Sequence, residues 1–89
     1  MRAETAAVTV DGNAVAGLLA DVFGGDATML VGVCGGCGAA APLAETVVEL
    51  DEAAAIVRCR SCTHTLLTVL REGEGIRVVF GMLREFVRR

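Results

Sequence analysis

All four cysteines of this chain lie in two Cys-x-x-Cys pairs, formed by Cys34, Cys37, Cys59 and Cys62. The two pairs are separated by 21 residues. Two thiolates three positions apart on a tight turn can both reach one tetrahedral metal ion at about 2.3 Å, and a second such turn completes the tetrahedron. Gly35, Gly36 and Gly38 suit the first turn, because glycine adopts the required backbone conformations at little cost. The spacing therefore predicts one four-thiolate site that holds a single zinc ion.

Disulfide bonds are the alternative use of these cysteines, in a chain that reaches an oxidising compartment. The first ten residues contain Glu4 and lack a long apolar run, so they do not have the pattern of an export signal. We therefore expect a cytoplasmic chain whose thiols stay reduced and available to a metal.

Catalytic chemistry is not expected from the same residues. A closed site of four thiolates leaves no open position for water, which disfavours hydrolysis by zinc. His64 is the only histidine, and with four thiolates nearby we expect it to be a strand side chain rather than a ligand. The glycines around Cys37 lack the lysine and the helix start of a phosphate-binding loop. The sequence thus predicts a protein that is not an enzyme and has no catalytic residues.

A helix is expected soon after the N-terminus. Residues 1–10 are predicted to be a flexible arm, and residues 11–89 a single domain. Asp11 or Asn13 can cap the helix, and Gly24-Gly25 can end it. Its apolar stripe has the spacing of an amphipathic helix and consists of Val15, Leu18, Leu19, Val22 and Phe23.

The rest of the chain has mostly the patterns of strands. The expected strands are residues 28–33, 44–50, 55–58, 63–71 and 76–80. Residues 63–71 have apolar side chains on both faces, which is typical of a central strand, and Glu72 to Gly75 form a turn to the next strand. Helical spacing returns at the C-terminus, where a short helix is expected from Met82, Leu83, Phe86 and Val87.

The composition predicts exposed apolar surface. Hydrophobic residues make up 54% of 89 residues, more than so small a domain can bury. We expect a homo-oligomer or a protein partner that contacts the apolar helix surface, formed by the N-terminal stripe together with the apolar C-terminal residues. Residues 27–44 carry no charge, but their glycines and Pro42 argue against a membrane span.

Two other functions remain open. Arg58 and Arg60 flank Cys59, so a nucleic-acid-binding or transcription-associated role is an alternative. A net charge of −3, the absence of Lys, and only three Phe as aromatics disfavour it. The run from Cys34 to Gly38 also fits a rubredoxin-like iron site, which would transfer electrons, although rubredoxins surround their iron with more aromatic side chains.

The order of strands and Cys-x-x-Cys turns, known as zinc knuckles, resembles the zinc-ribbon superfamily. From Asp11 onward the chain is also similar to a family of short actinobacterial proteins of unknown function. The matching residues are Asp11-Gly12-Asn13, the two cysteine pairs and Leu66-Leu67. The resemblance implies a small α+β zinc ribbon, in which an antiparallel sheet with two knuckles carries an N-terminal helix, and it implies a bound metal. It implies no activity, so a bacterial protein-interaction or accessory module is the expected function.

Overall fold

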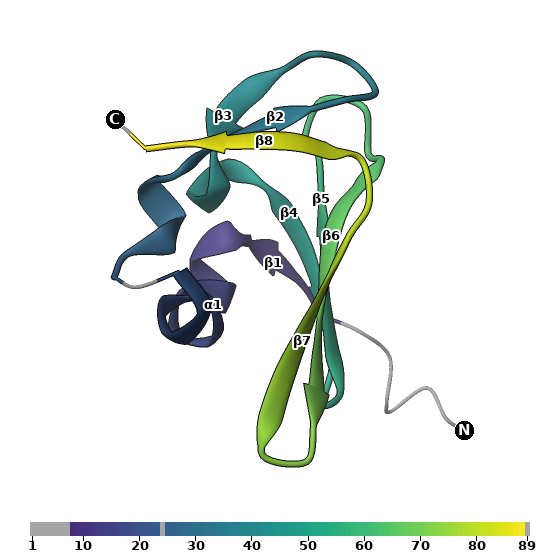
Figure 1. Cartoon of the computed structure of the whole chain (residues 1–89). Helices are drawn as coiled ribbons and strands as arrows, with labels where there is room; N and C mark the ends of the chain where they lie inside the picture. The colour runs from purple at the N-terminus through teal and green to yellow at the C-terminus, as the bar shows by residue number, and fades with distance from the viewer. Residues whose placement is uncertain (1–7, 24, 89) are drawn as a thin grey trace, which may run out of the picture.

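Two antiparallel sheets organise residues 8–23 and 25–88, the part of the chain that the computed structural model describes (Figure 1). The larger sheet has the order β1-β4-β5-β6-β7. Its strands are β1 (Val8–Asp11), β4 (Val47–Leu50), β5 (Ala54–Arg58), β6 (Thr65–Glu72) and β7 (Gly75–Phe80). The smaller sheet has the order β3-β2-β8, with β2 (Val31–Cys34), β3 (Ala40–Pro42) and β8 (Leu83–Val87). The helices are α1 (Ala16–Phe23) and three short 3-10 turns, η2 (Gly12–Val15), η3 (Ala27–Met29) and η4 (Leu43–Glu45).

The core lies between the helical segments and the central strands of the larger sheet. Val15 and Leu19 are fully buried and belong to the same cluster as Val48, Val57 and Val69 from β4, β5 and β6. Burial alternates along β5, as the period of two requires when one face of a strand is covered. Two cysteines of the candidate site are part of this cluster, so the site is built onto the core.

Most of the expected elements are confirmed, with shifted boundaries. Asp11 caps the helical segment, since its Oδ1 accepts from the Asn13 N–H at 3.0 Å. The described part of α1 ends at Phe23; Gly24 lies outside the described residues. The strand expected at 28–33 is shortened to β2 because η3 takes its first residues, and η4 shortens the strand expected at 44–50 in the same way.

The strand expected at 63–71 is central, as predicted. It corresponds to β6, which pairs with β5 on one side and with β7 on the other. Leu66 and Leu67 are both buried in the core. A register shift in the pairing of β5 with β6 leaves Leu66 as an extra residue of β6 at this point.

The predicted C-terminal helix is wrong. Residues 83–87 form β8, which pairs antiparallel with β2. A register shift places two residues of β8 opposite Val33, so that Leu83 and Phe86 fall on the same face of the strand. A bulge of this kind gives a strand the three-residue apolar spacing that is otherwise typical of a helix. Gly32 leaves room for both side chains, because a Cβ there would lie 3.2 Å from Leu83 and 3.4 Å from Phe86.

The predicted flexible arm is wrong for residues 8–10. They belong to β1, which pairs with β4 from Val8 opposite Leu50 to Asp11 opposite Val47. Pairing gives hydrogen-bond partners to backbone N–H and C=O groups along the edge of β4, and the local sequence of residues 8–10 does not reveal this stabilisation. Residues 1–7 of the expected arm lie outside the described residues.

The apolar stripe of the helix and the apolar C-terminal residues do not combine into one exposed surface, which corrects that expectation. Leu19 is fully buried, and Phe23 packs edge-on against Phe86 with ring centroids 5.4 Å apart. The apolar stripe of the helix and the apolar C-terminal residues therefore cover each other and the core. Val22 and Met82 are the members that stay exposed, at 45% and 38%. Within the described residues, no helix is long and apolar enough to cross a membrane.

Gly12 and Gly17 offer a matched pair of substitutions that tests this packing. A Cβ on Gly12 would lie 1.7 Å from the carbonyl oxygen of Leu43, whereas one on Gly17 would have no neighbour within 4 Å. We expect Gly12→Ala to lower the free energy of unfolding by about 3 kcal/mol or more, since backbone must move. Gly17→Ala should raise it by about 0.5–1 kcal/mol through helix propensity. Urea unfolding measures both, and equal effects would contradict the packing of η2 against η4.

Candidate metal centre

The four cysteines come together from the two different sheets. Cys34 and Cys37 lie on the turn between β2 and β3, and Cys59 and Cys62 on the turn between β5 and β6. All four Sγ atoms lie within 4.8 Å of one another. The Sγ atoms of Cys34 and Cys62 are 3.6 Å apart, and those of Cys37 and Cys59 are 3.7 Å apart. A tetrahedron with metal–sulfur bonds of about 2.3 Å has edges of about 3.8 Å, so the cluster has the size of a four-thiolate metal site.

The two turns have the same backbone hydrogen bonds. In the first knuckle, residues 34–38, the Gly38 N–H donates to the Cys34 carbonyl at 2.8 Å. In the second knuckle, residues 59–63, the Thr63 N–H donates to the Cys59 carbonyl at 2.9 Å. Gly38 and Thr63 both have positive φ, +79° and +67°. A β-branched residue rarely adopts this conformation, so other contacts must hold Thr63 in place.

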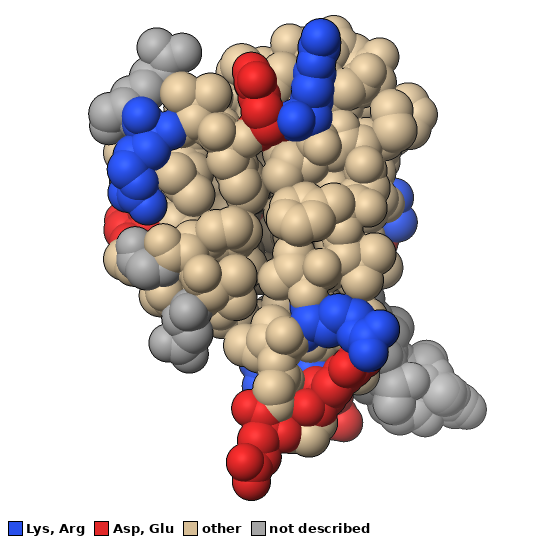
Figure 2. All heavy atoms as spheres, viewed as in Figure 1, with Lys and Arg blue, Asp and Glu red and all other residues tan. Residues whose placement is uncertain are grey.

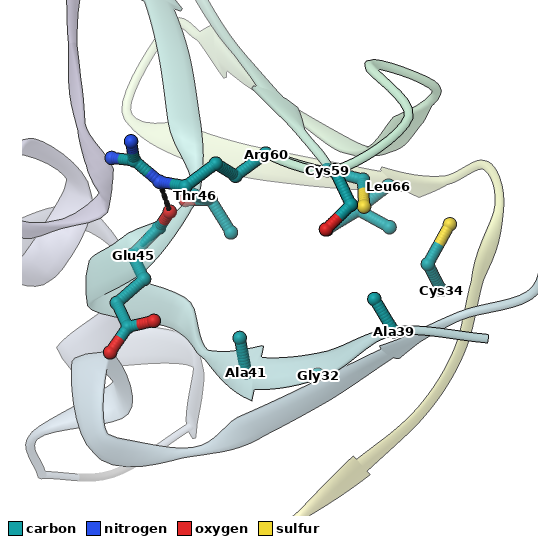
Figure 3. Close-up of a pocket in the computed structure, with 10 residues that line it drawn as sticks. Gly32, Cys34, Ala39, Ala41, Glu45, Thr46, Cys59, Arg60 and Leu66 are labelled. Carbon is teal, nitrogen blue, oxygen red and sulfur yellow. Dashed lines mark hydrogen bonds between the residues drawn. The ribbon is translucent and has the colours of Figure 1, made fainter. Parts of the chain in front are cut away.

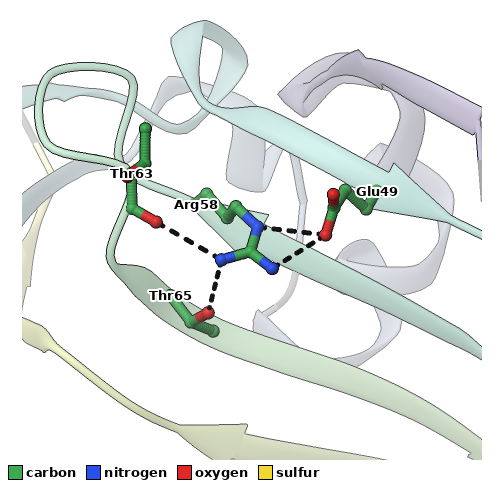
Figure 4. Close-up of polar contacts among 4 residues, drawn as sticks. All are labelled: Glu49, Arg58, Thr63 and Thr65. Atoms are coloured by element: carbon green, nitrogen blue, oxygen red, sulfur yellow. Dashed lines mark hydrogen bonds and ion pairs between the residues drawn. The ribbon is translucent and has the colours of Figure 1, made fainter.

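Arg58 holds the second knuckle (Figure 4). Its Nε and Nη2 donate to one carboxylate oxygen of Glu49 at 3.0 and 2.9 Å. Its Nη1 lies 3.3 Å from both the Thr63 carbonyl oxygen and the Thr65 hydroxyl. The guanidinium thus joins β4, the end of the knuckle and the start of β6, which offsets the unfavourable conformation of Thr63.

Met82 links the two knuckles through its backbone. Its carbonyl accepts from the Gly35 N–H at 2.7 Å, and its own N–H donates to the Thr65 carbonyl at 2.8 Å. The residue just before β8 therefore ties the first knuckle to the strand that leaves the second one. This connection helps to hold the two knuckles near each other.

One side of the cluster faces the interior and the other faces solvent. Cys34 and Cys59 are 1% and 5% exposed, whereas Cys37 is exposed and Cys62 half-buried. A cavity of about 100 Å³ lies on the inner side, lined in part by Cys34, Cys59 and Ala41 (Figure 3). At its rim Arg60 donates from Nε to the Glu45 carbonyl at 2.7 Å.

The thiols influence each other's ionisation. Burial opposes the thiolate of Cys59, but hydrogen bonds from the backbone N–H groups of Cys62 and Ser61 and from neighbouring thiols outweigh it and lower the pKa of Cys59 to about 7. The backbone N–H of His64 favours the thiolate of Cys62, yet burial and the neighbouring cysteines raise the pKa of Cys62 to about 12. Several negative sulfurs at these distances are costly unless a cation lies among them.

His64 lies just before β6 and contacts the cluster, which corrects the expectation that it is only a strand side chain near the site. Its Nδ1 lies 3.1 Å from Cys62 Sγ, and a Cβ on Gly36 would come within 2.8 Å of the same nitrogen. His64 therefore packs over the first knuckle while contacting a sulfur of the second. An imidazole N–H in this position can donate to a thiolate and leave the four sulfurs as the candidate ligands.

The four predicted cysteines lie close together in space. Sequence reasoning did not predict that His64, Arg58 and Met82 support them. His64 follows Cys62 by only two positions, and this spacing could have indicated a contact between their side chains. Arg58 and Met82 gave no local signal, because their roles depend on strands that are distant in sequence.

Residues 4–88 match DUF6510, described as a family of unknown function. The chain belongs to this family. No curated protein and no solved structure matches the chain significantly. The family has no assigned activity. The cysteine cluster, which could hold a metal ion, is the feature that bears on function.

The thiol pKa values predict that metal affinity rises with pH. Binding requires thiolates, and the pKa of about 12 for Cys62 means that its proton must be displaced at neutral pH, whereas Cys59, with a pKa of about 7, is then partly ionised. We expect the apparent affinity for Zn²⁺ to fall by more than about tenfold per unit between pH 8 and pH 6, because more than one proton is displaced. Titration against a competing chelator measures this, and calorimetry in two buffers counts the protons. A pH-independent affinity would contradict it.

Replacing His64 should weaken the site without changing its stoichiometry. We expect His64→Ala to bind one zinc ion with about tenfold lower affinity, since a hydrogen bond to a ligand sulfur is lost. His64→Gln, which keeps a side-chain N–H donor, should recover part of the affinity. Metal content and chelator competition check both variants. A protein that no longer holds one zinc ion after His64→Ala would show that His64 is a ligand.

Proposed function

We propose that the chain is a non-enzymatic zinc-ribbon protein whose four cysteine thiolates bind one structural zinc ion. We propose that it works as a protein-interaction or accessory module in the bacterial cytoplasm. The observation that carries the proposal is the sulfur geometry, with Sγ–Sγ distances of 3.6 and 3.7 Å between the two knuckles.

A structural role is supported by where the ligands come from. The first knuckle belongs to the smaller sheet and the second knuckle to the larger one. An ion bound to both would cross-link the sheets at the point where the core cluster reaches the surface. Four protein ligands leave no open coordination position, so the ion would contribute to folding rather than to a reaction.

Nucleic-acid binding is less well supported, because several arginines already form ion pairs or hydrogen bonds within the chain. Arg58 forms an ion pair with Glu49, and Arg77 with Glu72, at 2.9 and 3.1 Å. Arg60 donates to a backbone carbonyl at the cavity rim. Zinc on four thiolates would also add negative charge to a chain that is already acidic.

Metal analysis of protein purified without added metal tests the proposal. We expect one colourless zinc ion per chain, lost in Cys59→Ser together with much of the cooperative unfolding transition, since metal binding contributes about 10–16 kcal/mol in small zinc domains. Ser61→Ala, in the same turn, should keep both the metal and the transition.

A strong visible absorbance with stoichiometric iron would instead favour the rubredoxin-like alternative. Stoichiometric zinc and an unchanged melt in Cys59→Ser would overturn the four-thiolate site itself.

A further inference from the structure

No described strand pairs with the outer edge of β7. β7 is the last strand of the larger sheet and, among the described strands, pairs only with β6. Gly81 N–H donates to the Leu66 carbonyl, and hydrogen-bonded positions alternate along an antiparallel strand. Odd-numbered residues of β7 therefore face β6, while Ile76, Val78 and Phe80 direct their backbone N–H and C=O groups away from it.

This edge lacks the features that usually prevent strands from pairing with another chain. Natural edges are kept short, or carry Pro, Lys or inward-pointing charges. In the described structure β1 has four residues, β3 has three and ends at Pro42, and β8 carries Arg84 and Glu85. β7 has six residues, and its single charge, Arg77, is paired with Glu72 on β6.

Exposed apolar side chains accompany the open backbone. Val79 is 46% exposed and Phe80 is 59% exposed, although both lie within a strand. Figure 2 shows charged side chains around the hairpin tip at the lower end of this face, further charged side chains at its upper and left margins, and an uncharged surface between them. Backbone groups and apolar side chains are thus available along the same strand.

We propose that β7 pairs antiparallel with β7 of a second copy of this chain, so that the two five-stranded sheets join across a two-fold axis at Val78. This arrangement places Ile76 of one copy opposite Phe80 of the other, and the two Val78 residues opposite each other. Each of these pairs exchanges both N–H···O=C bonds. An isologous pairing of this kind is the usual form of a homodimer.

Charge repulsion favours the register with Val78 on the axis over the adjacent register with Arg77 on the axis. With Val78 on the axis, Arg77 lies opposite Val79 of the second copy, and no like charges face each other. A shift that placed Arg77 opposite Arg77 of the second copy would also satisfy the backbone, but like charges directly opposite are destabilising. The aromatic and β-branched pairs formed in the chosen register are among the favourable cross-strand contacts.

The proposal deepens the interaction role proposed above, and Val79 provides its test. The measurement is the mass by light scattering at about 100 μM, over a dilution series, with zinc content determined on the same samples. We expect about twice the monomer mass of 9.2 kDa. Val79→Arg places a positive charge opposite Arg77 of the second copy and should raise the dissociation constant at least about tenfold. Val79→Glu, at the same exposed position, should leave it unchanged or lower it, because opposite charges then face each other.

Phe80→Pro tests the backbone contribution separately. It removes an N–H that points away from β6, so the fold should persist by circular dichroism while dimerisation is lost. A monomeric wild-type protein at 100 μM, equal weakening by the two Val79 variants, or a dimer that survives Phe80→Pro would overturn the proposal. A zinc-loaded monomer would overturn only the dimer, whereas a metal-free dimer would overturn only the four-thiolate zinc site.

Discussion

Four cysteine sulfur atoms, two from each sheet, lie within 4.8 Å of one another, and the relative position of the two sheets depends on this approach. Cys34 ends β2 and Cys59 directly follows β5, each an inner strand of its sheet, so bringing the sulfurs together brings these strand ends together. The Met82 backbone reinforces the same junction by bonding to the first knuckle and to β6. Burial and the neighbouring cysteines raise the pKa of Cys62, so a negative charge on this sulfur is costly without a bound cation.

The two knuckles reach one geometry with different residues. The first uses Gly38 where φ is positive, and glycine adopts that conformation without a steric cost. The second places Thr63 at the equivalent position, where a β-branched side chain is unfavourable. The contacts of Arg58 with the Thr63 carbonyl and with Glu49 explain how this turn is held. Arg58 beside the cysteine cluster therefore serves the fold.

A bulge in β8 shows how a local pattern can mislead. Leu83 and Phe86 have the spacing of a helix, yet both face the core from a strand, because the register shifts opposite Val33. Pairing with β2 and packing of Phe86 on Phe23 outweigh any local preference for helix. The same packing buries much of the helical stripe, so many of the hydrophobic residues are buried within a single chain. The remainder is exposed on single residues and along β7.

The sequence by itself determined the elements whose causes are local. Cysteine spacing identified all four members of the cluster, since a three-residue separation is what places two sulfurs on one tight turn. Apolar residues on both faces identified the central strand, turn residues identified its hairpin, and Asp11 marked the start of the helical segment. Only the tertiary structure decided that residues 8–10 pair with β4, that the C-terminal residues form a strand, and that His64 contacts Cys62. These features depend on which segments meet across many residues of chain, and strand partners are chosen by the free energy of the whole packed arrangement rather than by neighbouring residues.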